Sequence, residues 1–513
     1  MSSRKKEEVF QLIKSLEKAE KRNFKLFVKR NSANQDLKII QLFDILDKLD
    51  EYDESQVLKL GKSLKKAQLS NLKAHLHKQI MASLRIIKDS QDIEYILHDH
   101  IENARLLYGK GLIHQSLKVL SKCKELAKTY HQGSFLLQIL LFEKKIESLH
   151  ITRSIKNRAQ ELAHEIECHH EKLSLIGKIS NLSLLLYGKY IENGHARSEA
   201  EIESIQTFFQ AGLPAGIQQA EGFYERMYLY QAYVWFAYIL QDFVLYFRYA
   251  RKWVDLFVDH PHMRPVETNF YLKGVHHLLQ AHYLTGRARK YEETIQEFKG
   301  FVESPGYLLH RNTRIQANIY LALAQLNHFL MTGKVDEGLA LVPEVEEFLE
   351  QYKLQMDPHH RLIFYYKIAS LYFVAEDYSK TVDYLTRIMN WTWNLRDDIQ
   401  CYTRLLHLIT HYELGNYDIL DSLAKSAYRY MAKMDNLSVV EEEIFRFIRQ
   451  SFNLYHEELP HAFIGLLNKL KEFENNPLER RAFNYLDFIS WLEAKIEKRA
   501  VKDILREKYG LPE

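Results

Sequence analysis

Apolar side chains recur along this chain at intervals of three and four residues, the spacing of one face of an α-helix. The alternation of apolar and polar residues that marks a strand is absent over any useful length. The chain holds only 9 prolines and 19 glycines in 513 residues, so residues that break helices are rare. We therefore predict an all-α fold of helices joined by short turns.

The helices are predicted to come in pairs, because turn signatures recur at a nearly constant interval. The intervals range from 39 to 47 residues, and the predicted turn centres are Gly111, Arg153, Gly194, Gln241, Gly286, Gly333, Glu376, Gly415 and the segment 458–460. A period of this size with two helices per unit is typical of an α-solenoid. We expect a right-handed superhelical array of about nine antiparallel helix pairs.

The clearest unit spans residues 357–390. Asp357 is a good N-cap and Pro358 a good first helical residue. An apolar stripe follows, residues 376–378 make a turn, and a second apolar stripe continues beyond it. The sequence therefore predicts two antiparallel helices here.

This unit resembles the tetratricopeptide repeat (TPR) at Ala369, Tyr372 and Tyr378, but has Thr381 where that repeat has a small residue. The resemblance covers residues 91–475 and is to a long-period variant, because the usual repeat has 34 residues. It implies a TPR-like domain that binds proteins.

Two positions after each of the first eight turn centres stands an apolar or aromatic residue. These residues are Ile113, Ile155, Ala196, Phe243, Ala288, Val335, Tyr378 and Tyr417. We expect each side chain to lie between the two helices of its pair.

The first 90 residues do not follow this period. They are predicted to form helices at about 4–15, 17–30, 36–50, 54–64 and 68–88, with Ser70 as the cap of the last. The last two helices could form a helix-turn-helix. The segment 16–30, LEKAEKRNFKLFVKR, resembles the start of uncharacterised bacterial proteins whose remainder is also TPR-like. That resemblance implies no activity.

The first 90 residues also differ in charge from the remainder of the chain. Residues 1–90 carry a net charge of +8, and the other 423 residues carry −5. Several cations follow a stripe of the predicted helix 17–30, whose other side is apolar. A one-sided basic helix suits phosphate or an acidic protein. The candidate contacts are Lys18, Lys21, Arg22, Lys25, Lys29 and Arg30.

Residues 476–513 are expected to cap the array, with a helix from Leu478 to about Ile496. The three cysteines are scattered, which suggests no disulfide framework. No secretory signal begins the chain, and the longest apolar run has nine residues, Ala232 to Leu240, too short for a membrane span. We expect a cytoplasmic protein with no membrane contact.

Motifs that carry chemistry are absent from the sequence. There is no G-x-S-x-G, no G-x-G-x-x-G and no phosphate-binding G-x-x-x-x-G-K. We therefore predict no catalytic residue, no cofactor and no enzyme activity.

Histidine is abundant, at 24 residues, but its spacing predicts no metal site. His164 with Cys168, and His407 with His411, each supply two ligands on a helix face, whereas zinc needs three or four protein ligands. The segment HEELPH at 456–461 places its histidines five apart, with a proline between them.

An aromatic belt spans residues 223–257, with fourteen aromatic side chains in 35 residues. Aromatic residues and arginine dominate protein interfaces, although the same spacing is also that of a helix core. The candidate groove contacts are Tyr224, Arg226, Tyr228, Trp235, Arg248 and Arg251.

These observations favour a scaffold or adaptor that binds a protein or peptide partner in the solenoid groove. The alternative is a nucleic-acid-associated regulator, in which residues 1–90 contact phosphates and the repeats sense a partner. Self-association through an exposed end of the array is a third expectation.

Overall fold

The structure is a computed structural model of the whole chain, and it is all-α in the residues that it describes. These are residues 4–30, 36–61, 64–86, 92–150, 157–304, 310–391, 397–434, 437–451, 454–455, 457–474, 476 and 478–509. No strand occurs among them. None of the helices in these ranges combines the length and the apolar character that a membrane crossing requires.

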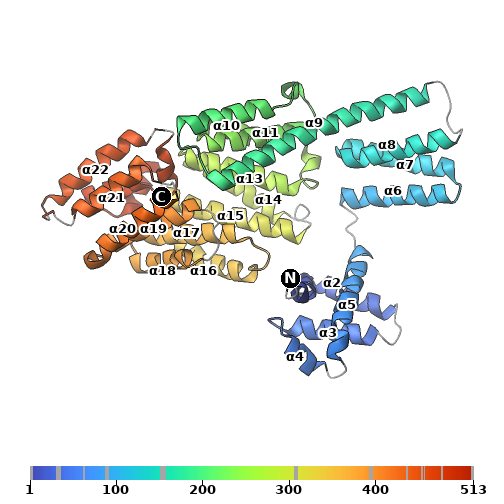
Figure 1. Cartoon of the computed structure of the whole chain (residues 1–513), viewed down its shortest axis with the longest axis horizontal. Helices are drawn as coiled ribbons and strands as arrows, with labels where there is room; N and C mark the ends of the chain where they lie inside the picture. Colours follow the sequence, from blue (N-terminus) through green and yellow to red (C-terminus); the bar gives the residue numbers. More distant parts are fainter. Residues whose placement is uncertain are drawn as a thin grey trace. The chain divides into compact units, whose positions relative to one another are not determined.

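The chain divides into two compact units, Met1–Cys123 and Lys124–Glu513 (Figure 1). The predicted boundary near residue 90 falls among residues outside the described ranges. The first unit contains α1 (Arg4–Ser15), α2 (Lys18–Arg30), α3 (Asp36–Lys48), α4 (Glu54–Leu60), α5 (Lys66–Ile86), α6 (Ile93–Gly109) and the beginning of α7 (Ile113–Thr129).

The helices of residues 4–86 follow the predicted pattern closely, with ends that differ by a few residues. Phe24 and Val28 of α2 are buried in one apolar core with residues of α1, α3 and α5. The predicted cap at Ser70 is wrong, because α5 begins four residues earlier, at Lys66. The apolar stripe of α5 includes Leu69, so the first turn is held by the core and needs no cap at Ser70.

The second unit begins within α7 and contains most of the helices. They are α8 (Gly133–Leu149), α9 (Arg158–Asn193), α10 (Glu199–Gly212), η1 (Ile217–Gln219), α11 (Phe223–Ile239), α12 (Phe243–Asp259), η2 (Pro261–Met263), α13 (Thr268–Leu284), α14 (Ala288–Glu303), α15 (Arg311–Thr332), α16 (Val335–Gln351), α17 (Pro358–Val374), α18 (Tyr378–Met389), α19 (Asp397–Glu413), α20 (Tyr417–Lys433), α21 (Val439–Ser451), α22 (Leu459–Phe473), η3 (Arg480–Asn484), α23 (Phe488–Glu497) and α24 (Val501–Tyr509).

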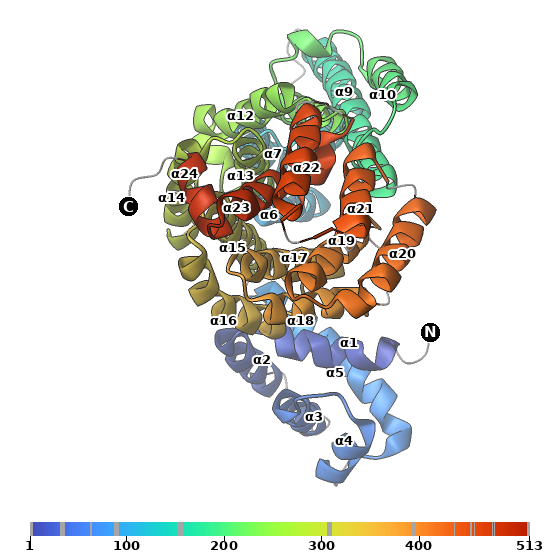
Figure 2. The same cartoon turned by 90° about the vertical axis from the view of Figure 1, so that its left-hand side faces the viewer.

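Helices of the second unit pack mainly on their neighbours in the chain. From α11 to α22, nearly every helix contacts the next, and α13, α15, α17 and α19 also contact one another in that order (Figures 1 and 2). A single apolar core runs from Leu272 of α13 to Leu505 of α24. Asp357 caps α17 and Pro358 is its first residue, as predicted.

Seven of the predicted turn centres fall at turns of the structure, whereas the one predicted in the segment 458–460 is wrong. Gly111, Gly194, Gln241, Gly286, Gly333, Glu376 and Gly415 all have positive φ, whereas Arg153 lies outside the described residues. At 458–460 the chain has already entered α22: Glu458 is its N-cap, and Pro460 lies in the first turn, where a proline suits a helix start.

Glu376 occupies a turn with positive φ although it is not glycine, and hydrogen bonds of the neighbouring Asp377 stabilise this turn. The Asp377 amide donates to the Tyr372 carbonyl at 3.0 Å, which closes α17. The Asp377 carboxylate then accepts from the Lys380 amide, which starts α18.

The wedge prediction holds at some turns and fails at Tyr417. Ala196, Phe243, Ala288 and Val335 are buried, but Tyr417 is 61% exposed. Its ring packs edge-on against Tyr412, at 6.4 Å between centroids, and so covers the turn from outside. Ile155 lies outside the described residues.

The continuous helix predicted from Leu478 to Ile496 is also wrong. The structure has the short helix η3 and then α23, whose N-cap is Asp487. The break between them coincides with Tyr485, which packs on α19. Because the long-range contacts of Tyr485 outweigh local helix propensity, the sequence pattern alone could not reveal this break.

Candidate functional site

The six predicted basic contacts all lie on α2, but two of them have carboxylate partners within the first unit. Lys21 pairs with Asp47 and Lys25 with Asp44, each at 2.6 Å. The remaining four are exposed: Lys18, Arg22, Lys29 and Arg30. The structure therefore directs Lys21 and Lys25 toward α3 and leaves an exposed edge with the other four side chains.

The tyrosines predicted as groove contacts, Tyr224 and Tyr228, have different surroundings. Tyr224 Oη donates to Glu267 at 2.6 Å, and burial and this carboxylate raise the pKa of Tyr224. Tyr228 is half-buried and packs on Phe270. These tyrosines pack among neighbouring helices.

The three predicted arginines also differ in their surroundings. Arg226 Nε donates to the Ala220 carbonyl at 3.5 Å. Arg248 is exposed, and Arg251 pairs with Asp255 one turn further along α12. Of the six predicted groove residues, only Trp235 lines the cavity described next.

One cavity, here called the inner cavity, is lined by successive helices of the second unit. It has a volume of about 190 Å³, and its walls come from α9, α11, α12, α13, α15, α17 and α19. Trp235, Tyr238 and Tyr246 give it an aromatic wall, and Gln280 and Asn327 face it from α13 and α15.

Two buried polar atoms of the inner cavity lack hydrogen-bond partners among the described residues. They are His277 Nε2 and Asn327 Oδ1. The other ring nitrogen of His277 forms a hydrogen bond with Tyr246 Oη at 2.8 Å, which fixes the ring. An unpaired buried polar group costs about 1–3 kcal/mol. These two atoms can therefore form hydrogen bonds with a bound molecule.

Lys367 of α17 adds a cation to the same wall. Its ammonium lies 5.2 Å from the centre of the Tyr283 ring, and burial lowers its pKa to about 8. A positive charge in a poorly hydrated site attracts a carboxylate strongly. The inner cavity thus combines aromatic faces, free hydrogen-bonding atoms and a cation.

Part of the inner wall is already covered by residues 480–486, here called the C-terminal strap. The Tyr485 ring stacks on Tyr402 at 3.9 Å, and its hydroxyl donates to Asp398. Tyr366 Oη donates to the Tyr485 carbonyl at 3.4 Å. The strap therefore contacts α17 and α19 through both its backbone and its side chains.

Sequence reasoning missed most of the inner cavity for an identifiable reason. His277, Asn327 and Lys367 belong to three different helices, and each occupies an ordinary helical position. Only the repeat period indicates that corresponding positions of successive helices face one another. The period can be read from the sequence, but it does not show which face of each helix lines the cavity.

No protein-family model, curated protein or solved structure matches this chain in the comparisons made with them.

Proposed function

We propose that this protein is a non-catalytic scaffold or adaptor whose second unit is a TPR-like α-solenoid. In this proposal the helix pairs stack into a right-handed superhelix, and the inner cavity captures a segment of a partner protein. The nearest-neighbour packing from α11 to α22 supports the solenoid, because each pair in such an array buries its apolar face on adjacent pairs.

The observation that carries the proposal is the packing of the C-terminal strap against the wall of the inner cavity. The strap, which consists of η3 and the two residues after it, already lies on the wall of the inner cavity, held by aromatic stacking and by a side-chain hydrogen bond to its backbone. A partner segment would be held by the same kinds of contact beside it. Its backbone groups would satisfy His277 Nε2 and Asn327 Oδ1.

The chemistry of the wall also defines the partner. Lys367 favours an acidic side chain, and Trp235 and Tyr238 favour an aromatic or long apolar side chain. The proposed ligand is therefore a segment that carries an acidic residue near an aromatic one.

The experiment is a pull-down from native lysate with the full chain and two matched variants. Gln280→Trp fills the inner cavity, whereas Gln296→Trp places the same ring on the exposed side of α14. We expect the unmodified chain and Gln296→Trp to retain a stoichiometric protein partner and Gln280→Trp to lose it. Nuclease treatment should change none of these results. Retention of the partner by Gln280→Trp, or the absence of any partner, would contradict the proposal.

A second candidate function is nucleic-acid association through the first unit. The observation that favours it is the exposed edge of α2, where Lys18, Arg22 and Lys29 follow one another at helical spacing. In this alternative the edge contacts phosphates and the repeats sense a partner.

A further inference from the structure

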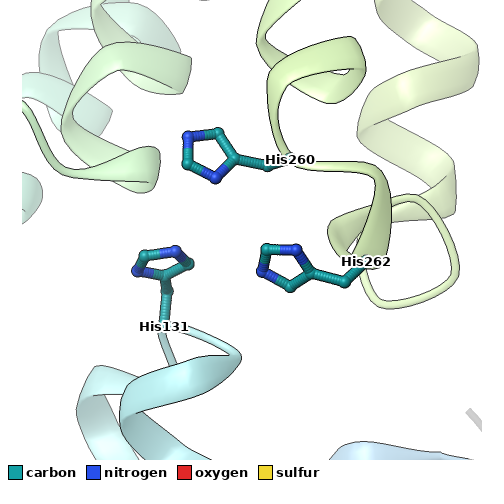
Figure 3. Close-up of side chains that lie close together, drawn as sticks. All are labelled: His131, His260 and His262. Carbon is teal, nitrogen blue, oxygen red and sulfur yellow. The ribbon is translucent and has the colours of Figure 1, made fainter.

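Three histidines from two separate loops face a common space in the second unit (Figure 3). His131 lies in the turn between α7 and α8. His260 ends α12, and His262 lies in η2. The ligand nitrogens of the three rings all lie within 4.8 Å of one another. No sequence motif connects them, because the two loops are far apart in the chain.

Backbone bonds fix the first loop. His131 has a φ of 53°, a left-handed conformation that histidine adopts more readily than most residues. The Gln132 amide donates to the Ala127 carbonyl at 2.7 Å, and the His131 amide donates to the Lys128 carbonyl at 3.2 Å. The turn thus directs the His131 side chain without depending on its ring.

The second loop is equally well anchored. Pro261 restricts the backbone between the two histidines, and the Met263 amide donates to the His260 carbonyl at 2.9 Å. Met263 is fully buried, and Arg264 Nε donates to the Phe257 carbonyl at 3.1 Å. His260 and His262 are therefore carried by a braced loop.

The buried ring of Phe223 packs against two of the three histidines. Phe223 stacks on His131, with centroids 5.8 Å apart, and meets His260 edge-on at 5.6 Å. The centroids of the three histidine rings are 5.7, 6.2 and 5.9 Å apart. Nitrogens bound to a tetrahedral zinc ion at about 2.0–2.1 Å lie about 3.3 Å apart. Small rotations of the rings would bring the present separation to that value.

The electrostatic surroundings favour neutral rings, the form that binds metal. Burial lowers the pKa of His131, and His260, His262 and Lys172 lower it further. Burial and His262 also lower the pKa of His260, with Arg226 acting in the same direction and Asp259 opposing. Three protonated rings at this separation would repel one another, whereas three neutral rings present lone pairs.

We propose that His131, His260 and His262 form a binding site for one divalent transition-metal ion, Zn²⁺ by its ligand chemistry. Imidazole nitrogen suits zinc, and three protein ligands leave a fourth position for water or another ligand. His262 is exposed, so the ion can enter from solvent. The bound ion would tie the α7–α8 turn to the end of α12.

The test uses the full chain, stripped with a chelator and titrated with Zn²⁺ against a chromophoric competitor. We expect one tight equivalent in the unmodified chain, and binding weaker by at least about tenfold in His262→Gln and in His131→Gln. His164→Gln, which alters the exposed His164–Cys168 pair, is the matched control and should bind like the unmodified chain.

Co²⁺ provides a second readout, because its visible absorption reports tetrahedral coordination. We expect that absorption in the unmodified chain and in His164→Gln, and its loss in His262→Gln. Since His262 is exposed, this variant keeps its fold, and circular dichroism verifies that. Unchanged zinc affinity in His262→Gln, or loss of binding in His164→Gln alone, would overturn the proposal.

Discussion

At the scale of the residue, Lys367 shows a conflict between stability and binding. The burial that lowers its pKa makes its protonated form unfavourable in the folded chain. The ammonium lies over an aromatic ring, which offsets only part of that cost. A cation kept at such a position suits a binding wall better than a core.

Lys367→Met is therefore expected to stabilise the fold and to weaken partner capture. At pH 7 the free energy of unfolding should rise by about 1–3 kcal/mol, because the variant removes a charge whose folded-state pKa is depressed. The penalty in the unmodified chain is complete below pH 8 and disappears as the pH rises toward 10.5. The advantage of the variant should shrink across that window.

Urea unfolding at pH 7, 9 and 10.5 measures this difference. Lys145→Met, at an exposed position of α8, is the control and should change stability by less than about 0.5 kcal/mol at each pH. An advantage of Lys367→Met that stays constant with pH would show that the ammonium is not the cause.

At the scale of the element, the sequence predicts where a helix ends better than it predicts which other helices that helix packs against. Asp357, Asp377 and the positive-φ turn residues act through bonds to residues at most five positions away, so the sequence could reveal them. The path of η3 and α23 depends on Tyr402 and Asp398, about 85 positions earlier, and no local pattern contains that information. The same difference explains why the inner cavity was missed.

The docking of α24 on α15 gives an element-scale prediction. Gly333 and Gly415 have nearly the same left-handed φ, 68° and 70°. An added Cβ at Gly415 meets only the Tyr417 ring at 3.7 Å, whereas at Gly333 it would clash with the Lys502 carbonyl of α24. Arg506 Nε donates to the Gly333 carbonyl at 3.2 Å in the same contact.

Gly415→Ala should therefore cost about 1 kcal/mol of stability through backbone strain alone. Gly333→Ala should cost about 2–4 kcal/mol, because it adds a steric clash with backbone. Hydrogen exchange of α24 should accelerate only in Gly333→Ala. Equal losses in the two variants would mean that α24 does not pack on this turn in solution.

At the scale of the whole molecule, charge and apolar packing are divided between the two units. The first unit has its own apolar core, and its residues 1–90 carry the excess of positive charge. The core of α13 to α24 belongs entirely to the second unit. Composition revealed this division of charge, whereas the pairing of Lys21 and Lys25 required the position of α3.

The nucleic-acid alternative is tested at this scale, because it concerns charge and salt. Lys18, Arg22 and Lys29 are changed together to Glu, and three exposed lysines outside residues 1–90, Lys118, Lys122 and Lys145, are changed together as the matched control. If the alternative is correct, binding of a fluorescent oligonucleotide falls steeply with salt and is lost only in the first variant. Equal losses in both variants, or no binding at 50 mM salt, would exclude a specific role for α2.

Under the proposed function, the C-terminal strap would compete with any partner for the part of the cavity wall that it covers. Because the strap is tethered to the wall it covers, its effective concentration there is on the order of millimolar, far above that of a free cellular protein. A segment of another protein that bound at the place of Tyr485 would have to overcome this advantage, whereas Trp235 and Tyr238 line the same cavity from α11. If the inner cavity binds a partner as proposed, the strap would therefore favour segments that contact α9 and α11 over segments that need the α19 surface beneath Tyr485.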